Sequence, residues 1–315
     1  MNLFKGLAKI AKKAPKKAPK KRFAPKPAVQ KKARVRRCAT VTFAGAGENG
    51  KGMEIVGDKN APGLDVEDLK RIFAEEQQKG TAPEWFDLNQ ICGVPVDHRT
   101  EPACIIRFRG GGDDIAGEEG VCDRLEAWLA SDSCLKQTRK FMWGRMTNSQ
   151  ARYNTLFYEG PATQPTDEEI EAGKSTKMPF DSNNDVWQMW KAMGRVVERD
   201  LAVAEVNHYF DVDSKASGIG YHGDKERNMV IMLRLGEGSE LMPLRFQAFV
   251  DGGTVGKNAV VHLKHGDVLI MPRSVCCPFW LDEKVTTWRH AAGNKAVWDR
   301  EKVRKFGPQP EEVHL

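Results

Sequence analysis

The sequence predicts an α+β fold in which helices stack against a C-terminal double-sheet sandwich or jelly roll. Between residues 38 and 199, apolar residues recur at helical spacing in several capped segments. After residue 200, short runs rich in β-branched and aromatic residues follow one another, separated by Gly, Pro, Asp and Ser. At 315 residues the chain is long enough for one large core with appended elements.

The first 37 residues differ in charge from the rest of the chain. They carry 15 Lys and Arg and no Asp or Glu, whereas the rest of the chain, from Cys38 on, carries 34 basic and 43 acidic side chains, a formal charge of −9. Prolines interrupt any continuous helix and the lysines repel one another, so we expect residues 1–37 to form a disordered arm. Such an arm neutralises phosphates without reading sequence, which favours nucleic-acid binding and nuclear import. A solubilising tail, or weak organelle targeting from its amphipathic start, is the alternative.

Cysteine usage and hydropathy narrow the class of protein. The seven cysteines are scattered, with no CxxC pair, which suits free thiols in a reducing compartment. No apolar run approaches the roughly 18 residues that a membrane span requires. We therefore expect an intracellular protein, with the nucleus favoured because of the arm. The oligomeric state stays open.

Residues 38–199 are expected to form an N-terminal extension of helices and strands, with a possible substrate lid. The helix over 63–80 has Asp65 as a possible N-cap and Gly80 as its stop. Core packing is the expected role of the apolar stripes on all these helices. The remaining segments are helices over 117–133 and 185–200, strands over 103–112 and 151–160, and a capped helical turn over 165–173.

Residues 200–300 are expected to form the double-sheet core, and residues 301–315 a C-terminal tail. Within the core, each β-rich run is bounded by turn-forming residues. The predicted strands lie within 201–210, 228–236, 243–253, 258–272 and 284–293.

A His-Gly-Asp tripeptide occurs twice, at 222–224 and at 265–267. Non-haem Fe(II) sites use two His and one carboxylate, and residues two apart on a strand point the same way. The first copy has a strand partner in His290, far enough along the chain for several strands to intervene. For the second copy His290 lies much closer in sequence, which leaves room for one hairpin. The first copy is thus the candidate ligand pair and the second a turn; on spacing alone, a surface turn plus a core histidine is the alternative.

Three segments resemble the AlkB-like family of 2-oxoglutarate/Fe(II)-dependent dioxygenases. They are "VNHYFDVDSKASGIGYHGDKERNMVIMLRLG", "HLKHGDVLIM" and "WRHAAG", which follow the family's order across residues 206–293. The chain is particularly similar to the divergent relatives found in algae and large viruses, and the likeness reaches weakly back to "ARYNTLFYEG". The resemblance implies a double-stranded β-helix, a jelly roll with the N-terminal helices packed on it.

The same resemblance implies specific site residues. His222, Asp224 and His290 would bind Fe(II), and Asn207 and Tyr209 would hydrogen-bond the 2-oxoglutarate cosubstrate. The family's arginine for the distal carboxylate, in an N-x-T-F-R segment after the last histidine, has no counterpart here. Arg234 lies ten residues after Asp224 and interrupts an apolar strand, so we expect it to supply this cation, with Arg300 or Lys295 as alternatives. The other interpretation of Arg234 is an arginine at a strand end that reaches solvent.

The resemblance and the basic arm together favour oxidative demethylation or hydroxylation of a nucleic-acid base, using Fe(II), 2-oxoglutarate and O₂. Arg152 and Asn154 are candidate substrate contacts in the lid. Two alternatives remain: a dioxygenase acting on a protein side chain or small molecule, and a catalytically inactive nucleic-acid-binding protein. Three aromatics are possible stacking residues, with core packing the more economical role: Tyr153, Tyr158 and Trp190.

Overall fold

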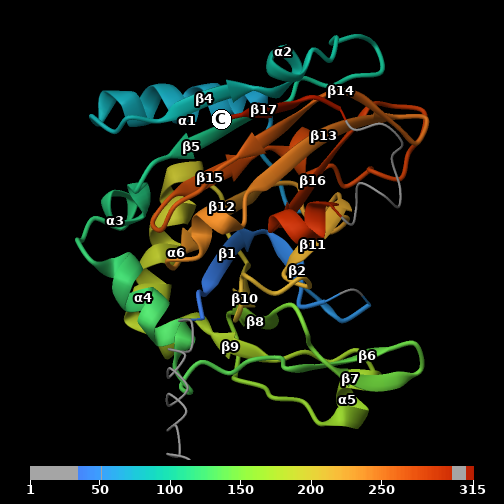
Figure 1. Ribbon diagram of the computed structural model, residues 1–315. Coiled ribbons are helices and arrows are strands. Elements are labelled where there is room, and N and C mark those ends of the chain that lie inside the picture. Colours follow the sequence, from blue (N-terminus) through green and yellow to red (C-terminus); the bar gives the residue numbers. More distant parts are fainter. Residues whose placement is uncertain (1–34, 51, 300–309) are drawn as a thin grey trace, which may run out of the picture. The chain divides into compact units, whose positions relative to one another are not determined.

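Two large β-sheets, two small hairpins and a set of helices make up the part of the chain that the computed structural model describes, residues 35–50, 52–299 and 310–315 (Figure 1). This part belongs to one unit, Val35–Leu315. The expectation of a mixed fold dominated by sheets is confirmed. Residues 1–34 of the predicted arm and most of the predicted tail lie outside the described residues.

The larger sheet has eight strands in the order β4-β5-β15-β12-β1-β10-β8-β9. Its central strands are antiparallel to their neighbours, with β1 between β10 and β12. The boundary expected near residue 200 falls inside this sheet, because strands from both sides of it are neighbours. The strands are β1 (Cys38–Ala44), β4 (Glu84–Asp87), β5 (Cys104–Phe108), β8 (Tyr153–Tyr158), β9 (Lys177–Pro179), β10 (Val203–Tyr209), β12 (Val230–Leu235) and β15 (Val268–Met271).

The smaller sheet has five strands in the order β11-β16-β13-β14-β17. Its first four strands pair antiparallel, whereas the C-terminal β17 joins β14 in parallel. The strands are β11 (Gly218–His222), β13 (Leu244–Val250), β14 (Gly253–Val261), β16 (Thr287–Gly293) and β17 (Glu312–His314).

Alternation along the strands separates two apolar cores. On β12, Ile231 and Leu233 belong to a core shared with the helices, while Val230 and Met232 join a core shared with the smaller sheet. This division follows from the strand period of two, which sends successive side chains to opposite faces. The larger sheet therefore has one face against helices and one against the smaller sheet.

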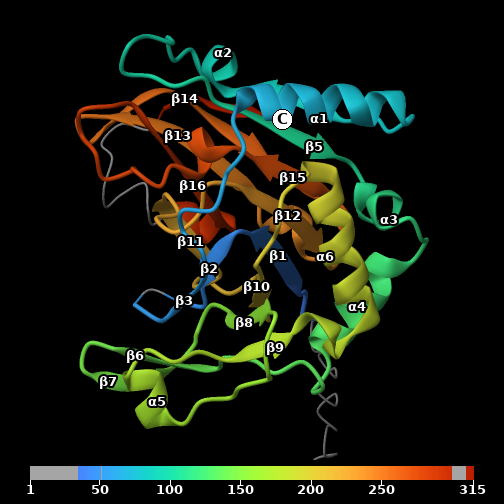
Figure 2. The same cartoon turned by 180° about the vertical axis from the view of Figure 1, so that it is seen from behind.

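Helices α1, α3, α4 and α6 cover the first of these faces, and α3, α4 and α6 lie together in both views (Figures 1 and 2). The predicted Asp65 cap of α1 is confirmed, since its carboxylate accepts a hydrogen bond from the Asp68 N–H at 2.9 Å. The described helices are α1 (Val66–Gln78), α2 (Leu88–Cys92), α3 (Gly111–Ala116), α4 (Val121–Ala130), α5 (Asp167–Glu171), α6 (Asn184–Val197) and α7 (Arg273–Cys276), with short 3₁₀ turns at Phe180–Ser182 and Ser239–Leu241.

Two separate hairpins complete the fold. The first pairs β2 (Ala46–Glu48) with β3 (Ile55–Gly57), and the second pairs β6 (Arg139–Met142) with β7 (Arg145–Asn148). Neither was among the predicted elements. No helix among the described residues combines the length and hydrophobicity needed to cross a lipid bilayer.

Candidate metal centre

The two predicted histidine ligands face each other across neighbouring strands. His222 ends β11 and pairs in register with His290 of β16, and their ring centroids are 4.5 Å apart. Asp224 follows two residues later, and its N–H donates to the Cys276 carbonyl at 2.8 Å. The Asp224 carboxylate lies 3.7 Å from His222 Nε2 and 3.5 Å from His290 Nε2. The structure thus brings together the three residues that the sequence singled out, and one ligand atom of each lies within 4.8 Å of the others.

The loop between His222 and Asp224 depends on glycine. A Cβ atom added to Gly223 would lie 2.5 Å from the Cys277 carbonyl oxygen and 2.6 Å from Trp280 Cβ. A larger residue would push the loop away from its neighbours and separate the two ligands. His222 is oriented by its Nδ1, which lies 2.9 Å from the Gly220 carbonyl oxygen. With the proton on Nδ1, the Nε2 lone pair faces the Asp224 carboxylate and is available to a metal ion.

Burial and charge favour the protonation states that metal ligands need. Burial lowers the pKa of His290 to about 4, against the opposing effect of the Asp224 carboxylate, so its imidazole is neutral at neutral pH. Burial would raise the pKa of Asp224, but His290, Arg227 and His222 lower it further than burial raises it. A neutral imidazole beside an ionised carboxylate is the state in which both groups coordinate a divalent cation.

A buried ionic network lies beside Asp224. Arg227 forms an ion pair with Glu205 of β10, donates to the Ala46 carbonyl at 3.2 Å, and approaches Asp224 at 3.8 Å. Burial raises the pKa of the neighbouring Glu226 to about 7, with Arg227 opposing this effect. The sequence reasoning missed Arg227 and Glu205; the signal for Glu205 was its place two residues before Asn207, on the same face of the strand.

The second His-Gly-Asp copy has a different role. The Asp267 carboxylate accepts hydrogen bonds from the Gly110 N–H at 2.7 Å and the Lys264 N–H at 2.8 Å, which is a turn-closing arrangement. His265 instead accepts from the Gly236 N–H at 2.9 Å and lies near carboxylates of α4. Gly266 has a φ of 82°, the left-handed conformation that favours glycine. This copy forms a turn, as the sequence predicted.

Arg234 lies on the face of the larger sheet opposite the helices. The register places Thr40 of β1 across from both Arg234 and Asn207. Arg234 is fully buried, and its Nη1 donates to Thr40 Oγ1 at 2.9 Å and contacts Cys38 Sγ at 3.4 Å. Its Nε and Nη2 have no hydrogen-bond partner among the described residues. A buried guanidinium with two unused donors is costly unless an anion completes it.

Asn207 and Tyr209 share one face of β10, two residues apart. Asn207 Oδ1 accepts hydrogen bonds from Arg152 and, at 2.9 Å, from Asn154 Nδ2. Burial raises the pKa of Tyr209, whereas the charges of Arg152 and Arg234 oppose this effect, so both cations act on the same buried hydroxyl. Four of the predicted contact residues therefore belong to one polar region: Asn207, Tyr209, Arg152 and Asn154.

Of the two alternative cations, only Lys295 lies among the described residues. Lys295 is exposed and paired with Asp299 at 2.6 Å, and Arg300 lies outside the described residues. The aromatics considered for stacking are mostly engaged: Trp190 stacks on Phe180 with centroids 3.9 Å apart, and Tyr153 packs on Phe210 at 4.5 Å. Sequence reasoning missed the exposed Trp143, for which the signal was a Trp-Gly pair between two short alternating runs.

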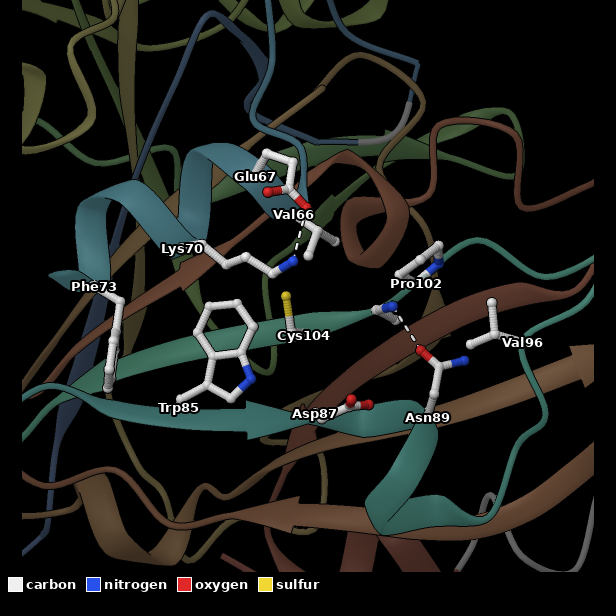
Figure 3. A pocket seen from close by; sticks show the side chains of 11 residues that line it. Val66, Glu67, Lys70, Phe73, Trp85, Asp87, Asn89, Val96, Pro102 and Cys104 are labelled. Atoms are coloured by element: carbon white, nitrogen blue, oxygen red, sulfur yellow. Dashed lines mark hydrogen bonds and ion pairs between the residues drawn. The ribbon is translucent and has the colours of Figure 1, made fainter.

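A cavity of about 540 Å³ lies apart from the candidate ligands, between α1 and the edge formed by β4 and β5 (Figure 3). Phe73 and Trp85 form its apolar wall, and the Lys70–Glu67 ion pair, 2.8 Å long, lies at its rim. None of the histidines, carboxylates or arginines described above lines this cavity.

Comparison with known proteins gives one clear likeness. The chain is 29% identical over 259 residues to an uncharacterised protein of Acanthamoeba polyphaga mimivirus, an alignment that covers 82% of this chain and 96% of the relative. No protein-family profile matches the chain. No solved structure matches it either.

Proposed function

We propose that the protein is an Fe(II)- and 2-oxoglutarate-dependent dioxygenase that oxidises a nucleic-acid base, with iron held by His222, Asp224 and His290. One observation carries this proposal: two histidines and one carboxylate, drawn from distant parts of the sequence, come within ligand distance of one another. This is the donor set of the facial triad, which leaves coordination positions open for cosubstrate and oxygen.

The strand arrangement supports a double-stranded β-helix, in which two sheets of four strands face each other. Strands β10, β1, β12 and β15 of the larger sheet and β11, β16, β13 and β14 of the smaller sheet fit this description. Side chains from β12 and β15 pack against β13, β14 and β16 in one shared core. Strand β1 lies between β10 and β12, and none of its residues is an arginine that could bind the cosubstrate.

The strand order supports a source for the cosubstrate cation other than an N-x-T-F-R segment after His290, which the sequence lacks. None of the described residues after Gly293 forms a strand of the larger sheet, since β17 pairs with β14 of the smaller one. The cation for a dicarboxylate comes instead from β12, next to β1. Arg234 has two unused donors for a carboxylate, and Tyr209 and Asn207 lie on the same face of the sheet.

Each group of the chain has a definable task in this proposal. Bound Fe(II), with 2-oxoglutarate and O₂, supplies the oxidation of a substrate C–H bond. His222, Asp224 and His290 hold the metal, while Arg234 fixes one end of the cosubstrate. The ion pair of Arg227 with Glu205 keeps a positive charge beside Asp224 and holds β10 against the ligand loop. The proposed nucleic-acid substrate rests on the sequence resemblance and on the basic residues of the arm.

The decisive test compares the two His-Gly-Asp copies. Succinate formation from 2-oxoglutarate is measured with anaerobically loaded Fe(II), for the native chain, His222→Ala and the matched control His265→Ala. We expect turnover to fall to background in His222→Ala and to persist in His265→Ala, because only the first histidine faces Asp224 and His290. Fe(II) binding, measured by equilibrium dialysis, should change in parallel.

The same assay with and without methylated single-stranded oligonucleotides tests the substrate. Stimulation by an oligonucleotide supports oxidation of a base. Succinate formation at the same rate with and without oligonucleotides indicates a protein or small-molecule substrate. Equal Fe(II) binding in the native chain and His222→Ala would contradict the metal centre.

A further inference from the structure

The hairpin of β6 and β7 presents a large aromatic side chain to solvent. The two strands are joined by a two-residue turn, Trp143-Gly144, since Met142 and Arg145 are paired. Trp143 is 84% exposed, more than any other large hydrophobic residue among those described. Its side chain therefore contributes little to the packing of the fold.

The backbone conformation at this turn is strained for a tryptophan side chain. Trp143 has a φ of 54° and Gly144 a φ of 73°. Two-residue hairpins with positive φ at both positions strongly favour Asn-Gly, because a bulky residue is strained in the left-handed region. A residue that strains the backbone and is this exposed points to a role outside folding.

The surroundings of the hairpin are basic. Residues 133–158 carry five Lys and Arg and no Asp or Glu, although the body as a whole is acidic. Lys140, Arg145 and Arg152 have no carboxylate partner among the described residues, whereas Arg139 pairs with Asp167 of α5. Burial and the like charge of Arg152 lower the pKa of Lys140, so these two cations lie near each other.

The base of the hairpin adjoins the candidate site. Arg152, the residue just before β8, donates to Asn207, and Ser217 Oγ, just before β11, lies 3.4 Å from the Ala151 carbonyl oxygen. The hairpin extends on the same side of the sheets as β11 in both views (Figures 1 and 2). An elongated anionic ligand contacting the hairpin would therefore lead toward the polar region around Asn207.

We propose that the β6–β7 hairpin docks single-stranded nucleic acid, with Trp143 stacking on a base and Lys140, Arg145 and Arg152 contacting phosphates. Aromatic stacking combined with a track of cations is how proteins bind single strands without reading their sequence. The inference rests on the proposed function only in naming the substrate class of the same site. An exposed aromatic flanked by cations also suits an anionic lipid surface, which the test below includes.

The test uses the full chain and the variant Trp143→Asn. Asn-Gly suits this turn, so the variant should fold and unfold at an equal or higher temperature than the native chain. Fluorescence anisotropy with labelled oligonucleotides of about 12 nucleotides, as DNA and as RNA, measures binding. Salt of about 200 mM limits the contribution of the basic arm. We expect Trp143→Asn to weaken binding by about 5- to 100-fold, and the control Trp187→Ala, on the exposed side of α6, to bind normally.

An oligonucleotide of the same length with abasic sites isolates the stacking contribution. Trp143→Asn should bind this probe as tightly as the native chain does, because no base remains to stack. Equal affinity of variant and native chain for the base-bearing probes would overturn the proposal, as would equal losses on both probes. Trp143-dependent binding to phosphatidylserine vesicles without any effect on oligonucleotides would overturn it in favour of a membrane.

The result is independent of the iron centre. His222→Ala should retain oligonucleotide binding, because His222 is not part of the hairpin. Normal base-dependent binding through Trp143 with no succinate formation would reject the proposed oxidation alone. Succinate formation with no effect of Trp143→Asn would reject the docking surface alone.

Discussion

Arg234 is the residue whose environment most needs a ligand. It is fully buried, yet Nε and Nη2 have no hydrogen-bond partner among the described residues. Proteins rarely leave a buried guanidinium in this state, because the lost hydration of a charged group is not recovered. A carboxylate accepting two parallel hydrogen bonds would satisfy both donors at once.

The substitution Arg234→Met separates a cosubstrate role from a structural one. We expect the apparent 2-oxoglutarate requirement to rise by about 10- to 100-fold, since charge-assisted hydrogen bonds are lost. The ligand-free variant should unfold at an equal or higher temperature, because an incompletely paired charge is removed from the core. Calorimetric titration and thermal unfolding with and without 2-oxoglutarate measure both effects. Lys295→Met is the control; a loss of stability in Arg234→Met with unchanged 2-oxoglutarate binding would assign the arginine to the fold.

At the scale of elements, β10 combines two environments through its alternating side chains. Glu205, Asn207 and Tyr209 face the candidate site, while His208 faces the opposite way and contacts Thr155 Oγ1 of β8 at 3.0 Å. Burial lowers the pKa of His208 to about 3 from 6.5, so its imidazole is neutral in the folded protein.

Because of His208, the free energy of unfolding of the protein should decrease on acidification. Below pH 6.5 the unfolded chain binds a proton at His208, whereas the folded chain binds it only near pH 3. The free energy of unfolding is therefore unaffected by this group above pH 6.5 and decreases as the pH falls from 6.5 toward 3. The loss is up to about 1.4 kcal/mol per pH unit. Urea unfolding at about pH 7.5 and about pH 5.5 should show a smaller loss for His208→Gln than for the native chain.

His265→Gln provides a control of opposite sign. The nearby Glu126 and Asp123 carboxylates raise the pKa of His265, so this residue adds stability below its unfolded pKa and loses it as pH rises. In His265→Gln the free energy of unfolding should therefore decrease more on acidification than in the native chain. The same pH dependence in all three proteins would contradict the neutral state of His208.

Sequence patterns predicted individual helices and strands better than they predicted which strands pair in the sheets. The Asp65 cap of α1, the apolar spacing of α1, α4 and α6, and the runs that form β10, β12 and β16 were recognisable, because helix and strand periods are local properties. Strand β1 was missed: its residues follow a basic arm, and its partners β10 and β12 lie on the far side of the whole N-terminal extension. Pairing at such a distance leaves no local signal.

The candidate site shows the same division. His222, Asp224 and His290 were identified from their spacing and from the resemblance, and the structure places them together. The contacts of Thr40 with Arg234 and of Glu205 with Arg227 depend on strand register and sheet order. Neither can be read from residues that are far apart in the sequence.

At the scale of the whole molecule, the basic arm precedes a strand in the centre of the larger sheet. Arg36 and Arg37, the last residues before β1, are already tied to the fold: their carbonyls accept hydrogen bonds from the Val212 and Gly238 N–H groups, and Arg36 pairs with Asp213 at 2.5 Å. Residues 1–34 hold 13 of the 15 basic residues of the arm. A truncation can therefore remove most of the positive charge of the arm without removing the central strand β1.

Two truncations test this arrangement. Removing residues 1–34 should leave thermal unfolding unchanged and flatten the salt dependence of oligonucleotide binding, because fewer counterions are released. Removing residues 1–44 also deletes β1, which pairs with both β10 and β12, and should prevent cooperative folding. The slope of log affinity against log salt and a melting curve distinguish the two outcomes. An unchanged salt slope after the shorter truncation would assign nucleic-acid binding to the folded part alone, where the cations beside Trp143 are the remaining candidates.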